Sequence, residues 1–135
     1  MVASDINLAV RFSVARERPW AYALSSQERA NPDLSRDANM SFYSGHATFL
    51  FALATAGGTI ATMRGYRWTP LVWLVGVPFA LATSYFRVAS DDHWMTDVLV
   101  GVAAGTGMGF AIPYFAHKRV KIVPAGGTVS LVGSF

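Results

Sequence analysis

Two arginines near the start of the chain, Arg11 and Arg18-Pro19, are the first residues suited to chemistry on an anion. Arginine stays ionised and presents a planar fork of donors that matches phosphate oxygens. The two side chains stand seven residues apart, which returns them to nearly the same face of a helix. We therefore expect one helix over Ile6–Arg18, ended by Pro19, with both guanidiniums on one face. Taken alone, the pair also fits arginines that snorkel at a membrane surface.

A second segment, Ser44-Gly45-His46, stands directly before a long apolar run. The N–H groups at a helix start attract anions, and Gly45 lets the backbone approach a ligand closely. Ser44 can donate a hydroxyl, and His46 can carry a proton near neutral pH. The plainer interpretation is an N-cap serine followed by an interfacial histidine.

The third segment contains Arg87, Asp91, Asp92, His93 and Asp97. His93 and Asp97 are four residues apart, hence neighbours on one helical face. A carboxylate there can bind one imidazole nitrogen and leave the other free as nucleophile or base. Asp91 or Asp92 is predicted to cap the helix that follows. A purely structural His–Asp hydrogen bond is the alternative, although ionisable groups at membrane depth favour function.

The elements that position these residues are predicted to be membrane helices. Of the 135 residues 53% are hydrophobic and 14% charged, so the chain is richer in apolar and poorer in charged groups than ordinary soluble domains. Ala47–Met63, Thr69–Phe86 and Val98–Ala116 each have the ~17 to 25 residues that a transmembrane helix needs. Pro78 and Pro113 are predicted to kink these helices rather than end them. The chain lacks cysteine, which excludes disulfides and thiolate metal sites.

Basic residues indicate how these spans are oriented. Arg64 and Arg67 follow the first span, and His117–Lys121 follows the third, so the positive-inside rule makes both ends cytoplasmic. All three polar segments then face the opposite side, where they combine charge neutralisation, an anion-binding helix start, an acid and a nucleophile. The net charge of +3 is scattered rather than clustered, which argues against nucleic acid as a partner.

The last span carries Gly101, Gly105 and Gly109 at intervals of four residues. Small residues on one helix face permit close helix contact, and we favour packing within the subunit over a dimer. Residues 1–121 are predicted to form one membrane helical domain. Residues 122–135 are a tail, in which the alternation of Val129 and Leu131 fits a short strand or disorder.

In order and spacing, the three segments resemble the motifs of the type 2 phosphatidic acid phosphatase superfamily, which also contains vanadium-dependent haloperoxidases. The family pattern K-x-x-x-x-x-x-R-P corresponds to Arg11 through Pro19, and P-S-G-H corresponds to Tyr43 through His46. S-R-x-x-x-x-x-H-x-x-x-D corresponds to Phe86 through Asp97. Arginine replaces the lysine of the first motif, Tyr43 replaces a proline, and Phe86 replaces a serine. Three spaced motifs are far more specific than one.

The resemblance implies a mechanism. Arg11, Arg18 and Arg87 would hold phosphate oxygens, with Ser44 and Gly45 adding hydrogen bonds. His93 would attack phosphorus, Asp97 would orient His93, and His46 would protonate the departing alkoxide, with no metal or other cofactor. The implied enzyme hydrolyses a lipid-linked phosphate monoester or pyrophosphate at the extracytoplasmic face of a membrane, which we expect to be a bacterial inner membrane with the site toward the periplasm.

The resemblance also bears on the fold, which we predict to be an all-α membrane bundle of about three transmembrane helices plus an N-terminal helix. This is a truncated version of the six-span core that membrane members of the family usually have. A homo-oligomer, or helices encoded upstream, would complete the bundle.

Three alternatives remain open. The chain can be a non-catalytic module that binds anionic headgroups or assembles with a larger partner. It can be a vanadate-dependent haloperoxidase, which the transmembrane spans disfavour. It can also hold a divalent metal at Asp92, His93 and Asp97, although no second histidine completes that set.

Overall fold

The computed structural model describes residues 2–31, 37–125 and 128–133. It confirms the predicted all-α bundle of three long helices and an N-terminal helix. In chain order the elements are α1 (Val2–Val14), the 3-10 helix η1 (Pro19–Ala23), α2 (Ser26–Arg29), α4 (Gly45–Met63), α5 (Thr69–Ala89), α6 (Met95–Arg119), β1 (Val120–Ala125) and β2 (Thr128–Gly133).

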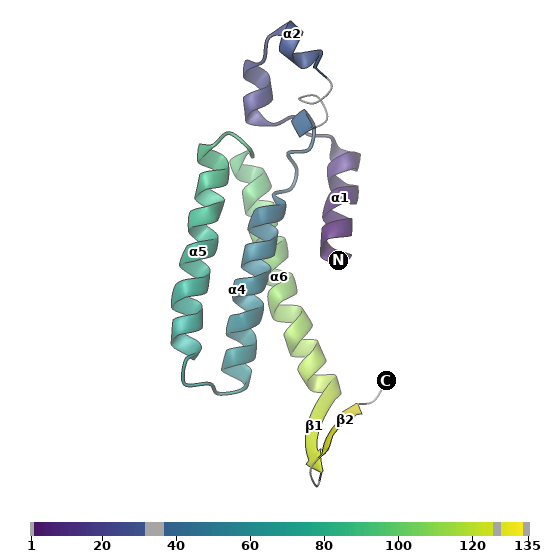
Figure 1. Ribbon diagram of the computed structural model, residues 1–135, viewed down its shortest axis with the longest axis vertical. Coiled ribbons are helices and arrows are strands. Elements are labelled where there is room, and N and C mark those ends of the chain that lie inside the picture. Colours follow the sequence, from purple (N-terminus) through teal and green to yellow (C-terminus); the bar gives the residue numbers. More distant parts are fainter. Residues whose placement is uncertain (1, 32–36, 126–127, 134–135) are drawn as a thin grey trace.

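The long helices α4, α5 and α6 run side by side, while α1 lies apart from α5 near one end of the bundle (Figure 1). Their portions Gly45–Met63, Thr69–Ala89 and Met95–Ala116 are long and apolar enough to cross a membrane. These portions contain the three predicted spans and begin or end a few residues beyond them. Pro78 and Pro113 lie inside helices, as predicted.

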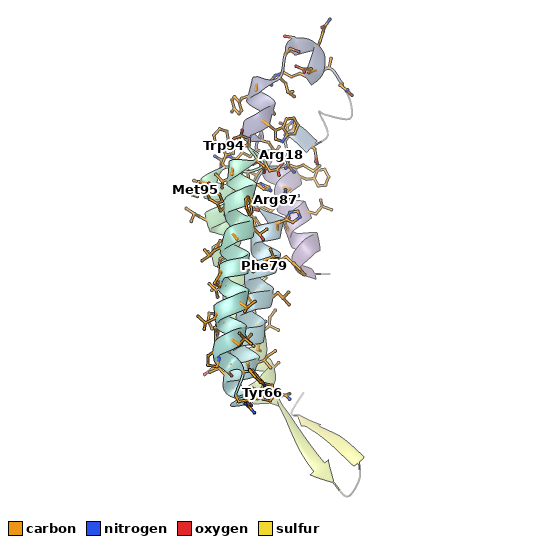
Figure 2. The ribbon with its side chains drawn as sticks, turned by 60° about the vertical axis from the view of Figure 1, so that its left-hand side comes forward. Arg18, Tyr66, Phe79, Arg87, Trp94 and Met95 are labelled. Carbon is orange, nitrogen blue, oxygen red and sulfur yellow. The ribbon has the colours of Figure 1, made fainter. Side chains whose placement is uncertain are left out.

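Helix α4 is the central helix of the bundle, because α5 and α6 both pack on it and touch each other little. Its buried residues are mostly small and include Ala47, Thr48, Ala54 and Thr55. By contrast α5 buries only Ala80 and Ser84 among the described residues and exposes large apolar side chains along its length (Figure 2). An apolar helix exposed to this degree is what a lipid environment accommodates.

Close contact between α4 and α6 depends on the three glycines of α6. A Cβ added at Gly105 would lie 2.3 Å from the Thr48 carbonyl oxygen, and one at Gly109 would collide with the Thr55 hydroxyl. A Cβ added at Gly101 would likewise lie 2.7 Å from the Ser44 carbonyl oxygen. The prediction that this glycine stripe packs within the subunit is therefore confirmed.

The N-terminal helix has the predicted length but lies earlier in the chain, over Val2–Val14 instead of Ile6–Arg18. It ends at Val14, and Ala15 has a positive φ of 47°, so the chain leaves the helix before Arg18. Arg18 is extended and precedes Pro19, which begins η1. The expectation that Arg11 and Arg18 share one helix face is wrong, because Ala15 turns the chain between them and Arg18 reaches the site from an extended segment.

The connections are short or locally capped. Gly65, with φ of 64°, ends α4, and the Tyr66 N–H donates to the Ala61 carbonyl in the usual glycine C-cap arrangement. Between η1 and α4, the single turn α2 is held by a capping box between Ser25 and Glu28, and residues 32–36 lie outside the described part. Beyond α6, β1 and β2 pair as an antiparallel hairpin.

Candidate active site

A cavity of about 950 Å³ opens beside α1, α4 and the link between α5 and α6. Six predicted site residues line it together: Arg11, Arg18, Gly45, His46, Arg87 and His93. From these polar residues the cavity continues between α4 and α6 along an apolar wall that includes Phe49, Ala52, Ile60, Met108 and Ile112. A charged end and an apolar extension therefore share one space.

The helix start at Ser44 forms as the sequence predicts. Ser44 is the N-cap of α4, and its hydroxyl accepts from the Ala47 N–H at 3.5 Å. Ser44 is buried and does not line the cavity, whereas Gly45 does. A Cβ at Gly45 would lie 3.1 Å from the Asn7 amide oxygen, so the glycine permits α1 to approach the start of α4.

The three arginines reach the cavity from different elements. Arg11 lies on α1 and donates from Nε to the Tyr43 carbonyl at 3.4 Å. Burial, together with the charges of Arg18 and Arg87, lowers the pKa of Arg11. Three guanidiniums that repel one another in this way make a strongly positive pocket, which an anion would stabilise.

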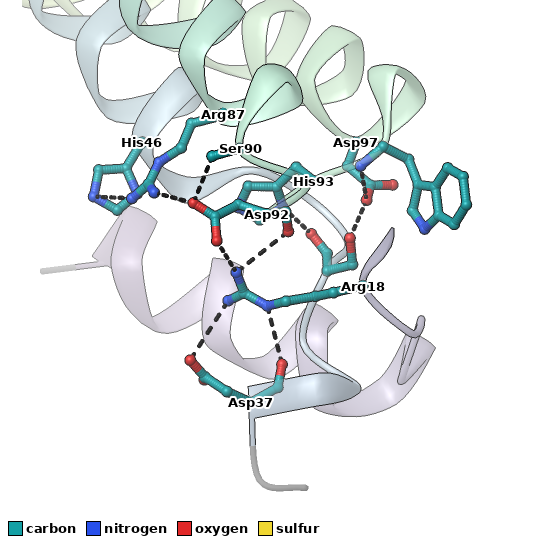
Figure 3. Close-up of polar contacts among 10 residues, drawn as sticks. Arg18, Asp37, His46, Arg87, Ser90, Asp92, His93 and Asp97 are labelled. Carbon is teal, nitrogen blue, oxygen red and sulfur yellow. Dashed lines mark hydrogen bonds and ion pairs between the residues drawn. The ribbon is translucent and has the colours of Figure 1, made fainter. Parts of the chain in front are cut away.

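Arg18 and Arg87 both contact Asp92. The Arg87 Nη1 donates to Asp92 Oδ2 at 2.5 Å, and Arg18 Nη1 lies 3.6 Å from Asp92 Oδ1 (Figure 3). Arg18 Nε also donates to the Asp37 carbonyl at 3.0 Å. Asp92 is thus an internal counter-ion for two of the arginines. This role differs from the helix cap or metal ligand that the sequence predicts.

His46 is exposed at the mouth of the cavity and faces Arg87. The Arg87 Nη2 lies 2.9 Å from His46 Nδ1 and 3.0 Å from His46 Nε2 (Figure 3). A guanidinium only donates, so the ring nitrogen that receives this contact carries a lone pair. The imidazole beside Arg87 can therefore exchange a proton with a group bound by the same arginine.

His93 is buried and has one nitrogen engaged by the protein. Its Nδ1 lies 2.7 Å from the Ser41 carbonyl oxygen. A carbonyl only accepts, so Nδ1 carries the proton and Nε2 bears the lone pair of the neutral ring. Burial lowers the pKa of His93 to about 4; the Ser41 hydrogen bond opposes this, and the charges of Arg18 and Arg11 add to it. At neutral pH the ring is therefore neutral.

Asp97 occupies a different place from the one predicted. Its carboxylate accepts from the Ser41 hydroxyl, from Arg16 Nη1 at 2.5 Å and from the Trp94 N–H at 3.2 Å. Within the described residues it makes no hydrogen bond to His93, because His93 precedes α6 rather than sharing a helical face with Asp97. The prediction that Asp91 or Asp92 caps the third long helix is wrong too. This helix, α6, begins only at Met95, and the carboxylate that accepts from the backbone N–H of Trp94 at its start belongs to Asp97.

Several contacts of the site had no signal in the sequence. Ser41 lies outside the three segments and Arg16 is an unspecified position of the first, and only folding brings them against Asp97. Asn7 donates to the Tyr43 carbonyl at 3.1 Å and joins α1 to the segment before α4. Asp92 could have been recognised as a counter-ion, because it stands among arginines of opposite charge. Among the described residues no three His, Asp or Glu side chains group as a metal site.

The fold and the cavity define a membrane-embedded helical protein with an arginine-rich anion site at one end of its bundle. The sequence profile of the PAP2 superfamily matches residues 1–121. The chain belongs to the PAP2 superfamily.

Individual relatives agree with this assignment. The chain is 34% identical over 82 residues to human "Phospholipid phosphatase 2", a match that covers 57% of this chain and 28% of the relative. The rat protein of the same name is 32% identical over 82 residues, covering 57% of this chain and 30% of the relative. The chain thus spans under a third of the length of these relatives. No solved structure matches significantly.

Proposed function

We propose that the protein hydrolyses a lipid-linked phosphate monoester or pyrophosphate through a phosphohistidine on His93, at the extracytoplasmic face of the membrane and without a metal. Membership of the PAP2 superfamily supports phosphatase chemistry, and the relatives named phospholipid phosphatase support a lipid substrate. The apolar extension of the cavity supports a substrate with a hydrocarbon tail.

The observation that carries the proposal is the environment of the two His93 nitrogens. Nδ1 is committed to the Ser41 carbonyl, and the ring lines a cavity that also contains Arg11, Arg18 and Arg87. The lone pair is therefore on Nε2, which has no hydrogen-bond partner among the described residues. A neutral imidazole beside guanidiniums is suited to attack a phosphate whose charge those guanidiniums neutralise.

The first half of the reaction forms the bond from His93 Nε2 to phosphorus and breaks the bond from phosphorus to the leaving oxygen of the lipid. The leaving oxygen takes a proton from the imidazolium form of His46, in which both ring nitrogens donate, so the bound phosphate takes the place of the contact with Arg87. Arg11, Arg18 and Arg87 neutralise the phosphoryl oxygens, together with the Gly45 N–H at the start of α4. Ser44, which the resemblance implies as a further donor to phosphate, is buried and off the cavity wall, so its role here is to cap that helix start.

In the second half a water molecule attacks phosphorus and gives its proton to His46. The bond from phosphorus to Nε2 breaks, inorganic phosphate leaves, and both histidines return to their starting protonation states. Asp97 stabilises the positive ring at a distance, through the Ser41 segment rather than by direct contact.

The test is phosphate release from a short-chain phosphatidic acid by the purified protein in detergent micelles. His93→Asn should abolish release, and His46→Ala should slow it about 100-fold or more. His117→Asn makes the same substitution near the opposite end of α6 and should leave release unchanged. A radiolabelled phosphate on the protein that is stable to base and labile to acid should appear with the parent chain and not with His93→Asn.

Phosphate release from His93→Asn at the parent rate would overturn the assignment of the nucleophile. Binding of orthovanadate by a parent chain that releases no phosphate would support a headgroup-binding module instead.

A further inference from the structure

Behind His93 lies a completely buried pair of residues, Ser41 and Asp97. Their side chains are both 0% exposed, and His93 itself is 2% exposed. Of the three only His93 lines the cavity. The pair therefore cannot touch substrate, and any effect on the reaction has to pass through His93.

Every polar group of Ser41 is engaged. Its hydroxyl donates to Asp97 Oδ2, its N–H donates to the Arg16 carbonyl at 3.0 Å, and its carbonyl accepts from His93 Nδ1 at 2.7 Å. The hydroxyl and the carbonyl belong to one residue, so fixing the first restricts the second. Ser41 is thus the bridge between the Asp97 carboxylate and the His93 ring.

The Asp97 carboxylate that accepts from Ser41 is itself fixed in position by other donors. In addition to Ser41 it accepts from Arg16 Nη1 and from the Trp94 N–H, and the Arg16 charge compensates the buried carboxylate. Arg16 is itself held by the Thr96 hydroxyl at 2.7 Å and lies over the Trp94 ring. A buried carboxylate with three donors is fixed in position.

We propose that Ser41 is a positioning residue for the nucleophile. Its hydroxyl is fixed by the Asp97 carboxylate, and its carbonyl therefore keeps the His93 ring oriented with the proton on Nδ1. The proposal rests on the proposed function, because it concerns the nucleophile of that reaction. Ser41 lies outside all three motif segments, so the motifs assign it no role.

Loss of the hydrogen bond between His93 Nδ1 and the Ser41 carbonyl would change the tautomer of the His93 ring. A neutral histidine can carry its proton on either nitrogen, and the partner of one nitrogen decides which. If the Ser41 carbonyl moves away from Nδ1, the proton can occupy Nε2, where it blocks attack on phosphorus. A bond that merely joins the Ser41 segment to α6 would affect stability and leave the tautomer unchanged.

The first experiment reads the tautomer directly by nitrogen NMR of histidine-labelled protein in detergent. The chain has three histidines, and the His93 signals are assigned as those missing from His93→Asn. The parent chain should show the Nδ1–H tautomer, and Ser41→Ala should populate Nε2–H. Ser84→Ala is the matched control, because Ser84 is buried on α5 and its hydroxyl has no partner among the described residues. An unchanged tautomer in folded Ser41→Ala would overturn the proposal.

The second experiment measures phosphate release by Ser41→Ala, Asp97→Asn and the double variant. Ser41→Ala should lower kcat about 10- to 100-fold with little change in KM, the usual size of effect for the partner that orients a functional imidazole. The double variant should be no slower than the slower single variant, because both changes break one path. Effects that multiply would show that Asp97 acts independently of Ser41 and would overturn the proposal.

Ser41→Cys is a second variant that tests the proposal if Ser41→Ala fails to fold. The thiol is nearly the size of the hydroxyl and donates weakly, so tautomer and kcat should lie between those of the parent and Ser41→Ala. Behaviour of Ser41→Cys identical to the parent in both measurements, with Ser41→Ala unfolded, would count against the proposal. A parent chain that shows Nδ1–H but releases no phosphate would refute the proposed function and leave the tautomer test valid.

Discussion

The two ring nitrogens of His93 meet opposite environments. Nδ1 faces a buried backbone carbonyl, and the rest of the ring borders a cavity with three guanidiniums. Burial and positive charge both disfavour protonation, so the ring is kept neutral with no hydrogen-bond partner on Nε2 among the described residues. A nucleophile needs this state, and residues on the two sides of the ring produce it together.

The first prediction concerns the protonation of His93. Because burial lowers its pKa to about 4, the ring should stay neutral well below the ordinary histidine range near 6.5. The unfolded chain takes up this proton first, so the contribution of His93 to stability falls as pH drops from about 6.5 toward 4.

An NMR titration of His93 is the appropriate measurement, because a phosphate substrate has its own pKa near 6 and would obscure a rate profile. A His93 ring that titrates near 6.5 would contradict the prediction.

The second prediction concerns Asp92, whose pKa is lowered. Burial alone would raise it, but the hydrogen bond from Ser90 and the charge of Arg87 outweigh burial. A phosphate that binds Arg18 and Arg87 must compete with this carboxylate. Asp92→Asn should therefore tighten inhibition by orthovanadate, by up to about fivefold if the partly exposed pairs are worth about 1 kcal/mol.

Inhibition constants of the parent and Asp92→Asn, measured at two salt concentrations, check this prediction. The difference should shrink at high salt if it is electrostatic. Asp37→Asn is the control, because Asp37 is exposed and 3.8 Å from Arg18. Weaker inhibition of Asp92→Asn would show that Asp92 mainly positions the arginines.

Sequence patterns located the charged side chains of the site but not the contacts between them. Arg11, His46, Arg87 and His93 were predicted from residue type and spacing, and all four line the cavity. The partner of Asp97 was not predictable, because Ser41 is 56 residues away in sequence and has no distinguishing neighbours. Spacing within a motif reports local geometry only, whereas this bond depends on tertiary packing.

At the level of elements, helix boundaries followed the sequence where strong local signals exist. Ser44 begins α4 as a cap and Gly65 ends it in a left-handed conformation. The end of α1 was missed because Ala15 gives no sign of a break and still adopts a positive φ. Alanine normally favours helix, so the tertiary position of Arg18 overrides local preference here.

The third prediction tests the packing of α4 against α6. Gly105→Ala would place a Cβ 2.3 Å from the Thr48 carbonyl, and overpacking of this kind costs about 1–3 kcal/mol. Gly107→Ala is a matched control two residues away, where nothing lies within 4 Å of the added Cβ. Gly107→Ala should be neutral or more stable, since alanine favours helix by up to about 1 kcal/mol.

Thermal unfolding of both variants in one detergent, followed by circular dichroism, provides the comparison. Gly105→Ala should unfold at a lower temperature than the parent, and Gly107→Ala should not. Equal midpoints for the two variants would mean that α4 and α6 do not pack as closely as the structure indicates.

At the scale of the whole molecule, exposed apolar side chains cover the long helices from one end to the other. Phe79 lies midway along the bundle, between Arg87 and Trp94 at the site end and Tyr66 at the other (Figure 2). This arrangement fits a hydrocarbon layer around the middle, with polar groups and amphipathic rings at both ends. The reactive phosphate would then meet the arginines at the surface while its tail stays among the helices.

The final prediction concerns orientation. Arg64 and Arg67 lie at the end of the bundle opposite the site, so the positive-inside rule directs the site to the extracytoplasmic side. The chain has no cysteine, which makes single-cysteine labelling clean. In intact bacterial cells a membrane-impermeant maleimide should label Ser26→Cys on α2 and should not label Tyr66→Cys until the membrane is opened. Both positions are exposed, so accessibility to solvent alone does not distinguish them. Labelling of Tyr66→Cys in intact cells, with Ser26→Cys protected, would place the site on the cytoplasmic face and redirect the search for its substrate to that leaflet.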